Sequence, residues 1–280
     1  MKALNLGCGQ RIHPSWTNID RAAHCPGVRA WDLSRGIPFP DGEFDVVYHS
    51  HLLEHLPRDK GQVLLRDCFR VTRPGGIIRV AVPDLERITR LYLESLERAL
   101  RGDLQGMRNY EWMVLEMYDQ TVREKSGGVM IDYCQQDPMP NEEFVIERFG
   151  GEARRVLDDI RASRVLETDT RQNATLVSVF KSRFRTLWRG RRRAFWRLFL
   201  GKERGEALQL GLFRRGGEVH QWMYDRYSLA RALETAGFSE PRQVAASESR
   251  ISGWKDFGLD TEPDGAIYKP DSLYMEALKP

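Results

Sequence analysis

The first nine residues constrain the fold of this chain most. Leu4–Leu6 is a short apolar run that leads directly into Gly7-Cys8-Gly9. We predict a buried strand followed by a glycine-rich turn, because a residue without Cβ lets the backbone approach a ligand closely. The third glycine of a dinucleotide-binding fingerprint would fall at position 12, which is Ile12. The pattern alone leaves a plain turn and a nucleotide-binding turn both open.

Further strands are predicted before residue 85, and two of them end near an acidic residue. Asp20 closes the segment 16–20, and Asp32 lies near the end of the segment 28–33. Only about ten residues separate Gly7 from the second strand, fewer than a parallel crossover usually takes. The first crossover helix is therefore expected to be stunted or replaced by a loop. The remaining expected elements are strands at 44–49 and 77–82, a helix over 59–70 and a stop at 74–76.

This alternation of strands and short crossovers indicates an open, doubly wound, mostly parallel α/β sheet. Such sheets bind ligands beyond the carboxyl ends of their strands. The glycine turn, Asp20, Asp32 and residues 50–51 would all lie at that edge. Two strands at 241–246 and 272–277 are expected to add an antiparallel hairpin at the C-terminal end of the chain.

Residues 85–217 interrupt the strand pattern and are expected to form a large helical insertion. Leu85–Leu100 has helical periodicity, and Ile88 and Leu100 are among the residues spaced for one face. The predicted domains are thus a sheet domain of residues 1–84 and 218–280 and a helical domain of residues 85–217. Within the insertion, further helices are predicted over 111–122 and 141–166.

Charge is nearly balanced along most of the chain. The 43 basic and 40 acidic residues give a net charge of +3, which does not by itself indicate a nucleic-acid binder. Residues 181–204 are the exception, with ten Lys or Arg against one acid and with Trp and Phe interleaved. We interpret this stretch as an interfacial helix on an anionic membrane surface. A subunit interface, as in a homo-oligomer, is an alternative, and a nucleic-acid surface is less favoured.

The sequence contains no pattern for export or for crossing a membrane. No signal peptide precedes the first strand, and no apolar run approaches the ~20 residues that span a bilayer. The expectation is a cytoplasmic protein, peripheral at the inner face of the membrane where residues 181–204 contact lipid. The four cysteines lack C-x-x-C spacing and predict neither a disulfide framework nor a zinc site.

Several short motifs together resemble one enzyme family. In order and spacing they are similar to class I S-adenosylmethionine-dependent methyltransferases, most of all to the small-molecule and glycan-associated branch. The resemblance implies a Rossmann-like sheet, S-adenosylmethionine as the cofactor, and an insertion that binds the acceptor or forms a lid. It resumes at 227–238, which resembles the last helix of the family. The motifs are LNLGCG at 4–9, NID at 18–20, DL at 32–33, IPFPDGEFD at 37–45, LEHL at 53–56 and RPGG at 73–76.

The resemblance also implies roles for individual residues. Asp20 would accept the ribose hydroxyls, Asp32 would accept from the adenine amino group with Leu33 against the ring, and Ser50 would border the methyl group. If the acceptor is a hydroxyl, a general base assists, and His51, Asp84 and His220 are the candidates. The predicted cofactor-binding residues are Asn5, Gly7, Gly9, Asp20, Asp32, Leu33 and Ser50.

Other interpretations were weighed against this one. Residues 51–55 fit H-x-x-E-H, an inverted zinc-peptidase motif, but they fall at a strand-to-helix turn and no downstream acid stands out as a third ligand. We therefore predict a capping or packing role for Glu54 and His55 and no metal. An NAD-dependent oxidoreductase and a non-catalytic S-adenosylmethionine-binding scaffold protein are the alternative functions. The expected reaction is methyl transfer to an oxygen of a sugar, glycolipid or other small molecule.

Overall fold

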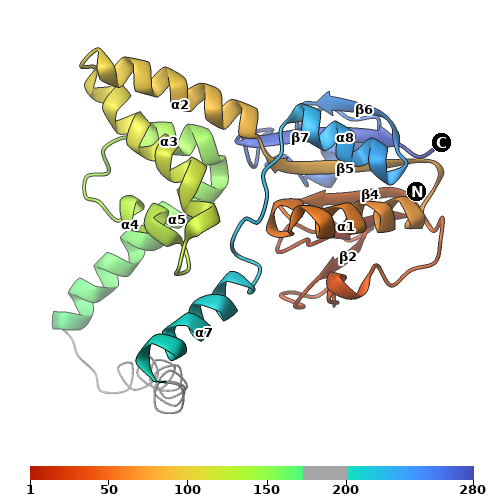
Figure 1. Ribbon diagram of the computed structural model, residues 1–280, viewed down its shortest axis with the longest axis horizontal. Coiled ribbons are helices and arrows are strands. Elements are labelled where there is room, and N and C mark those ends of the chain that lie inside the picture. Colours follow the sequence, from red (N-terminus) through yellow and green to blue (C-terminus); the bar gives the residue numbers. More distant parts are fainter. Residues whose placement is uncertain (173–200) are drawn as a thin grey trace.

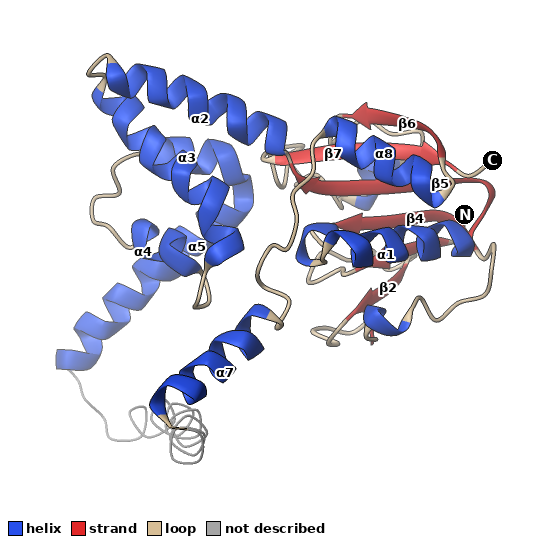
Figure 2. Cartoon of the chain, in the orientation of Figure 1, coloured by secondary structure: helices blue, strands red, loops and turns tan. Residues whose placement is uncertain are grey.

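A single mixed sheet organises the two ends of the chain. The structure is a computed structural model that describes residues 1–172 and 201–280. Within these ranges, seven strands form one sheet in the order β3-β2-β1-β4-β5-β7-β6 (Figure 1, Figure 2). The strands are β1 Ala3–Leu6, β2 Thr17–Asp20, β3 Val28–Ala30, β4 Phe44–Ser50, β5 Thr72–Pro83, β6 Ser239–Val244 and β7 Ser272–Leu278.

The direction of the strands confirms the predicted fold class. β1 to β5 run parallel, and β7 pairs antiparallel with both β5 and β6. The sheet is therefore mostly parallel, with an antiparallel strand pair from the C-terminal end of the chain. The connection between β1 and β2 contains no helix, as expected from its length.

The start of β5 differs from the prediction. Helix α1 (Arg58–Val71) is followed at once by Thr72 in β5, so residues 74–76 lie inside the strand instead of separating the two elements. The register between β4 and β5 shifts at this point, which accommodates the extra residues. Gly75 and Gly76 exchange backbone hydrogen bonds of 2.8 and 2.9 Å with Lys279, so this segment remains paired.

The two faces of the sheet are covered differently. On one face pack α1 and α8 (Arg226–Ala236), with Leu65 and Leu233 fully buried in the shared core (Figure 1). On the other face lies an aromatic cluster that includes Trp16, Tyr48 and Trp254. Trp254 begins the short helix η3 (Trp254–Phe257), so a loop-rich segment covers this side.

On the sheet face around Trp254, β5 contributes a buried charged side chain, Arg79. Arg79 is 0% exposed and donates to Asp260 and Glu276 at 2.8 and 2.7 Å. Its guanidinium also lies over the Trp254 ring, 4.3 Å from the centroid. Tyr48 donates a 2.6 Å hydrogen bond to the same Asp260. This network ties the loop-rich segment to the central strands.

The helical part has a core of its own around Trp112, which is 2% exposed. A buried ion pair joins Glu116 to Arg148 within it. Leu100, predicted on the same face as Ile88, is 79% exposed at the end of its helix, where no neighbouring element covers it. The helices are α2 Leu85–Leu100, α3 Leu104–Val122, α4 Gly128–Cys134, α5 Glu142–Gln172 with a kink at Gly150, and α7 Lys202–Arg214.

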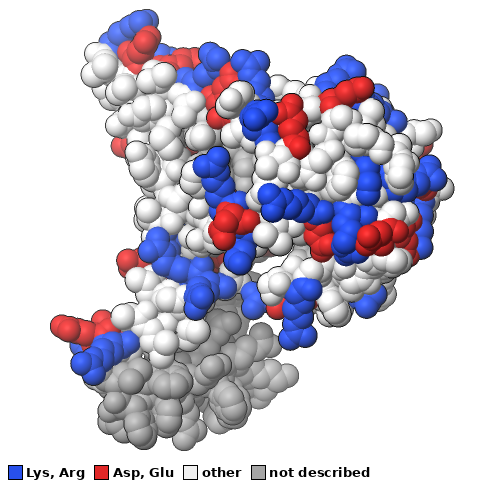
Figure 3. Space-filling view, turned by 45° about the vertical axis from the view of Figure 1, so that its right-hand side comes forward, with Lys and Arg blue, Asp and Glu red and all other residues white. Residues whose placement is uncertain are grey.

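The described surface includes only the end of the stretch that was predicted to contact a membrane. On the face drawn in Figure 3, acidic and basic side chains are interspersed over the sheet. Residues 181–200 of the basic aromatic stretch lie outside the described residues, so its predicted helix stays a prediction. Among the helices in the described ranges, none is both long enough and apolar enough to cross a membrane.

Candidate active site

The glycine turn after β1 is braced by the acid at the end of β2. Gly7 and Gly9 have φ of 62° and 52°, which a residue with a Cβ rarely adopts. The amide of Gly9 donates a 2.8 Å hydrogen bond to Asp20 Oδ2. A Cβ on Gly9 would meet nothing within 4 Å, so the turn faces open space. The two strongest predicted cofactor contacts thus lie together at the carboxyl edge of the sheet.

The other predicted cofactor residues lie in more varied positions. Asn5 is 1% exposed, and its amide donates to the Arg11 carbonyl and to Asn18 at 2.9 and 3.1 Å. Its side chain therefore supports the β1–β2 connection from inside, which is a structural task. Asp32 is exposed and caps the short helix η1 (Leu33–Arg35), where hydrogen bonds from Ser34 lower the pKa of its carboxyl. Its neighbour Leu33 packs against the sheet core.

The segment after β4 is a tight turn, as expected for residues that lie between a strand and a helix. Ser50 ends β4 half-buried, and His51 follows with φ of 50°, in the left-handed region. The short helix η2 (Leu53–His55) comes next. His51 and His55 therefore do not share one helical face, because the turn between them is not helical.

His51 lies between two oxygen-bearing side chains. Its Nδ1 is 3.2 Å from Glu54 Oε1, and its Nε2 is 2.7 Å from Ser272 Oγ. Glu54 is 0% exposed. Burial alone raises the pKa of Glu54, but the contact with His51 and the nearby rings of His55 and His220 bring it down to about 2. Glu54 is thus a buried carboxylate that contacts and orients His51.

His220 reaches the same carboxylate from a distant part of the chain. It is 6% exposed, and its amide donates to the carbonyl of Gln120 in α3 at 2.9 Å. Its ring meets the His55 ring edge to face at a centroid distance of 4.7 Å. Burial lowers the pKa of His220 to about 3, so its imidazole is neutral at neutral pH. Two of the three predicted bases, His51 and His220, therefore face Glu54.

Asp84, the third predicted base, lies one strand further along. It caps α2 by accepting a 3.2 Å hydrogen bond from the amide of Arg87. Its own amide donates to the carbonyl of Asp271, next to Ser272 in β7. Burial raises the pKa of the Asp84 carboxyl. Asp84 thus lies near the Ser272 side of His51.

Two features of this edge were missed by sequence reasoning. Glu54 had only a packing role in the prediction, because its partner His220 is far away in sequence and no local pattern links them. The second is Tyr268, whose ring lies 3.9 Å from the Arg11 guanidinium and whose hydroxyl accepts from Arg155 at 2.8 Å. Tyr268 therefore joins the β1–β2 connection to α5, where a crossover helix is absent.

A cavity of about 220 Å³ lies between α3, α4 and α5. Apolar side chains such as Trp112 and Phe149 form much of its wall. Two of its lining residues contact segments near the sheet edge. The carbonyl of Gln120 accepts a hydrogen bond from the amide of His220, and Glu152 forms a 3.0 Å ion pair with Lys269. The cavity is thus adjacent to the histidine cluster.

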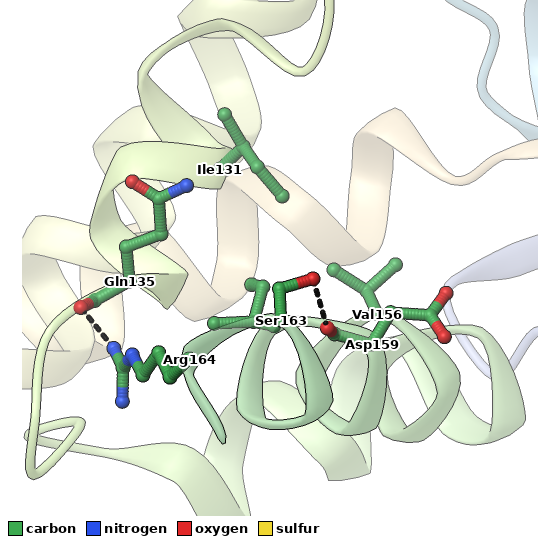
Figure 4. A pocket seen from close by; sticks show the side chains of 7 residues that line it. Ile131, Gln135, Val156, Asp159, Ser163 and Arg164 are labelled. Carbon is green, nitrogen blue, oxygen red and sulfur yellow. Dashed lines mark hydrogen bonds between the residues drawn. The ribbon is translucent and has the colours of Figure 1, made fainter. Parts of the chain in front are cut away.

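A second cavity of about 580 Å³ lies further from the sheet (Figure 4). Its seven lining residues come from α4, α5 and the residue after α4. Ser163 donates to the carbonyl of Asp159 at 2.8 Å, and Arg164 donates to the carbonyl of Gln135. Because no strand end contributes to this cavity, it does not belong to the candidate site.

Comparison with known proteins matches part of the chain to methyltransferases. Residues 12–80 match a family model described as a methyltransferase domain. Over 53 residues the chain is 45% identical to a Mycolicibacterium smegmatis protein named "Probable S-adenosylmethionine-dependent methyltransferase". This alignment covers 19% of the chain and only 19% of the relative. The matched stretch 12–80 includes Asp20, Asp32 and His51, and the cofactor that these matches support is S-adenosylmethionine.

The chain is also similar to solved structures that are described as S-adenosylmethionine-dependent methyltransferases. A methyltransferase from Archaeoglobus fulgidus shows 13% identity and a TM-score of 0.38, over 99% of this chain and 86% of that one. One from Thermotoga maritima shows 11% identity and a TM-score of 0.37, over 100% and 82%. Both TM-scores lie below 0.5, so the fold assignment rests on the strand order and pairing described above.

Proposed function

We propose that this protein transfers a methyl group from S-adenosylmethionine to an oxygen of a sugar, glycolipid or other small-molecule acceptor. The observation that carries the proposal is the hydrogen bond from Gly9 to Asp20 at the carboxyl edge of a β3-β2-β1-β4-β5-β7-β6 sheet. It places an open backbone turn beside a carboxylate that can accept from ribose hydroxyls. The methyltransferase-domain match begins directly after this turn, at residue 12.

The bound cofactor would supply an activated methyl group on a sulfonium. The protein has to align the acceptor with that carbon, exclude water and remove the acceptor proton. His51 suits the last task, because Glu54 faces its Nδ1 at 3.2 Å and its Nε2 is directed to Ser272. A proton taken up at Nε2 would be stabilised by the Glu54 carboxylate, as in other carboxylate–histidine pairs.

The cavity between α3, α4 and α5 supports an acceptor with an apolar part. Its wall contains Trp112, Met130, Val145 and Phe149, which favour a hydrocarbon or aromatic group over a fully hydrated sugar. The histidine cluster is adjacent through Gln120. A glycolipid or an aryl-bearing small molecule would fit such a site better than a free sugar.

Two measurements test the proposal. Calorimetric titration should show binding of S-adenosylmethionine and S-adenosylhomocysteine, and none of NAD. Incubation of cell extract with the protein and methyl-labelled cofactor should then transfer label to a small molecule detected by mass spectrometry. Binding of NAD alone would favour an oxidoreductase. Cofactor binding without transfer to any extract component would favour a scaffold protein and contradict the catalytic part of the proposal.

A further inference from the structure

The polar cluster around Glu54 contains more unpaired ligand atoms than proton transfer requires. Glu54 is 0% exposed; His51 Nδ1 lies 3.2 Å from its Oε1, and no hydrogen bond within the described residues satisfies its Oε2. His55 Nδ1 and His220 Nδ1 are buried and also lack a hydrogen-bond partner. A buried carboxylate with an unsatisfied oxygen is costly unless a cation compensates its charge. The cluster therefore has the composition of a cation site.

We propose that Glu54, His55 and His220 bind one divalent transition-metal ion, with Zn²⁺ as the best fit. One ligand atom from each residue lies within 4.8 Å of the other two. A tetrahedral zinc ion with bonds near 2.1 Å holds its ligand atoms roughly 3.4 Å apart. Small side-chain rotations would close the three atoms onto an ion.

The donor set decides which metal fits. Two imidazoles and one carboxylate form the His₂Glu set of zinc sites that keep a fourth position for water or a substrate oxygen. Mg²⁺ and Ca²⁺ prefer sites made of oxygen ligands and would gain little from His55 and His220. His51 lies on the Glu54 side of the cluster, 3.2 Å from Oε1. Because a carboxylate has two oxygens with several lone pairs, Glu54 can contact the ion and still orient His51.

The backbone holds these ligands in place without help from the ion. The amides of Gln221 and Trp222 donate to the Glu54 carbonyl at 2.7 and 3.2 Å, and the His220 amide donates to Gln120 at 2.9 Å. These bonds fasten the segment before α8 to η2 and to α3. An ion bound here would connect three parts of the chain: η2, α3 through Gln120, and the loop before α8 that includes His220. Its first role would be to lock the helical part onto the sheet edge.

The inference does not depend on methyl transfer, and metal binding can be measured directly. The protein of residues 1–280, made metal-free with a chelator and dialysed, is titrated with Zn²⁺ by calorimetry, and with Mg²⁺ and Ca²⁺ in parallel. We expect one equivalent of Zn²⁺ per chain at micromolar or tighter affinity. We also expect a rise in Tm of about 5 °C at a hundredfold excess over Kd. Mg²⁺ and Ca²⁺ should not bind.

Variants locate the site. Glu54→Gln and His220→Gln should each weaken Zn²⁺ binding at least 100-fold, whereas the matched control His24→Gln, at an exposed imidazole, should keep the affinity of the parent. If Glu54→Gln does not fold, as judged by circular dichroism, His55→Gln replaces it, because this side chain is 23% exposed and its loss is less disruptive. With Co²⁺ in place of Zn²⁺, visible bands without thiolate charge transfer would exclude binding by the cysteines.

Two outcomes would overturn the proposal. The first is no stoichiometric binding of Zn²⁺ to the parent. The second is binding that survives in the folded Glu54 and His220 variants with unchanged affinity, because the ion would then be held elsewhere. S-adenosylmethionine binding, measured on the same variants, reports separately on the proposed function. A protein that binds the cofactor but not Zn²⁺ would keep the function and lose the metal site.

Discussion

Asp20 Oδ2 accepts a 2.8 Å hydrogen bond from the amide of Gly9, so one carboxylate both braces the glycine turn and faces the space above it. Its second oxygen, Oδ1, has a 3.4 Å contact with the amide of Ala22 and lies 3.7 Å from His24 Nε2. A carboxylate oxygen has two acceptor lone pairs, so Asp20 retains capacity for ribose hydroxyls. The turn and the proposed cofactor contact are thus one structural unit.

Replacing Asp20 should weaken S-adenosylmethionine binding while the protein still folds. Asp20→Ala removes the ribose acceptor and the brace on Gly9, so we expect S-adenosylmethionine affinity to fall about 30-fold, or about 2 kcal/mol. Asp20→Asn keeps an oxygen that can accept from Gly9, and it should lose less. Calorimetric titration measures both. A folded Asp20→Ala protein that binds the cofactor as tightly as the parent would show that the acid is not a cofactor contact.

Turnover should depend on His51 more than on its hydroxyl partner. His51→Gln removes the ring that would take up the acceptor proton, so we expect kcat to fall about 10²-fold with cofactor affinity unchanged. Ser272→Ala removes only the group 2.7 Å from Nε2 and should cost less than tenfold. The measurement is methyl transfer under saturating cofactor. If His51→Gln keeps full activity between about pH 6 and pH 9, the base is Asp84 or His220, or none is used.

Local patterns in the sequence predicted the sheet and the position of its cofactor edge. Apolar runs, the turn at Gly7–Gly9 and the acid Asp20 are short-range signals, and each lies where the predicted fold class puts it. The methyltransferase resemblance added candidate roles to those positions. The position of Asn5 shows the limit of such transfer, because its side chain turns inward to the β1–β2 connection and not toward the open turn.

The histidine cluster could not be predicted, because it is made by tertiary structure. Glu54 and His220 are separated by most of the chain, and backbone bonds from Gln221 bring them together. The H-x-x-E-H pattern was visible, but the strand-to-helix turn expected there gave no indication that His220 would join Glu54 and His55. The choice of His51 and His220 as bases came from residue type, and only their common neighbour Glu54 gives them a shared site.

Arg79 should be the most sensitive charge in the fold. Arg79→Met leaves Glu276 and Asp260 buried without their cation, so we expect a loss of about 3–5 kcal/mol in the free energy of unfolding. The control Arg90→Met breaks an exposed pair with Glu86 and should cost under about 0.5 kcal/mol. Urea denaturation compares the two. Equal stability of the two variants would contradict the structural role of the buried network.

Stability should fall on mild acidification, and His49 in β4 should account for part of the loss. Its ring is 0% exposed, and neither nitrogen has a hydrogen-bond partner. Burial lowers the pKa of His49 from 6.5 to about 4, although the Glu54 carboxylate partly opposes the shift. In the unfolded chain His49 therefore binds a proton below about pH 6.5, whereas in the folded protein it does so only below about pH 4. This difference in proton binding lowers the free energy of unfolding by about 2 kcal/mol at pH 5 and hardly changes it at neutral pH.

His49→Leu removes this titration while keeping an apolar side chain of similar size. The free energy of unfolding of the variant should therefore fall less than that of the parent between pH 7 and pH 5, by about 2 kcal/mol. The control His24→Gln, at an exposed ring, should keep the slope of the parent. Denaturant titrations at the two pH values give the comparison. Parallel losses in the parent and in His49→Leu would mean that the folded protein accommodates a protonated His49, and that the acid sensitivity comes from other groups.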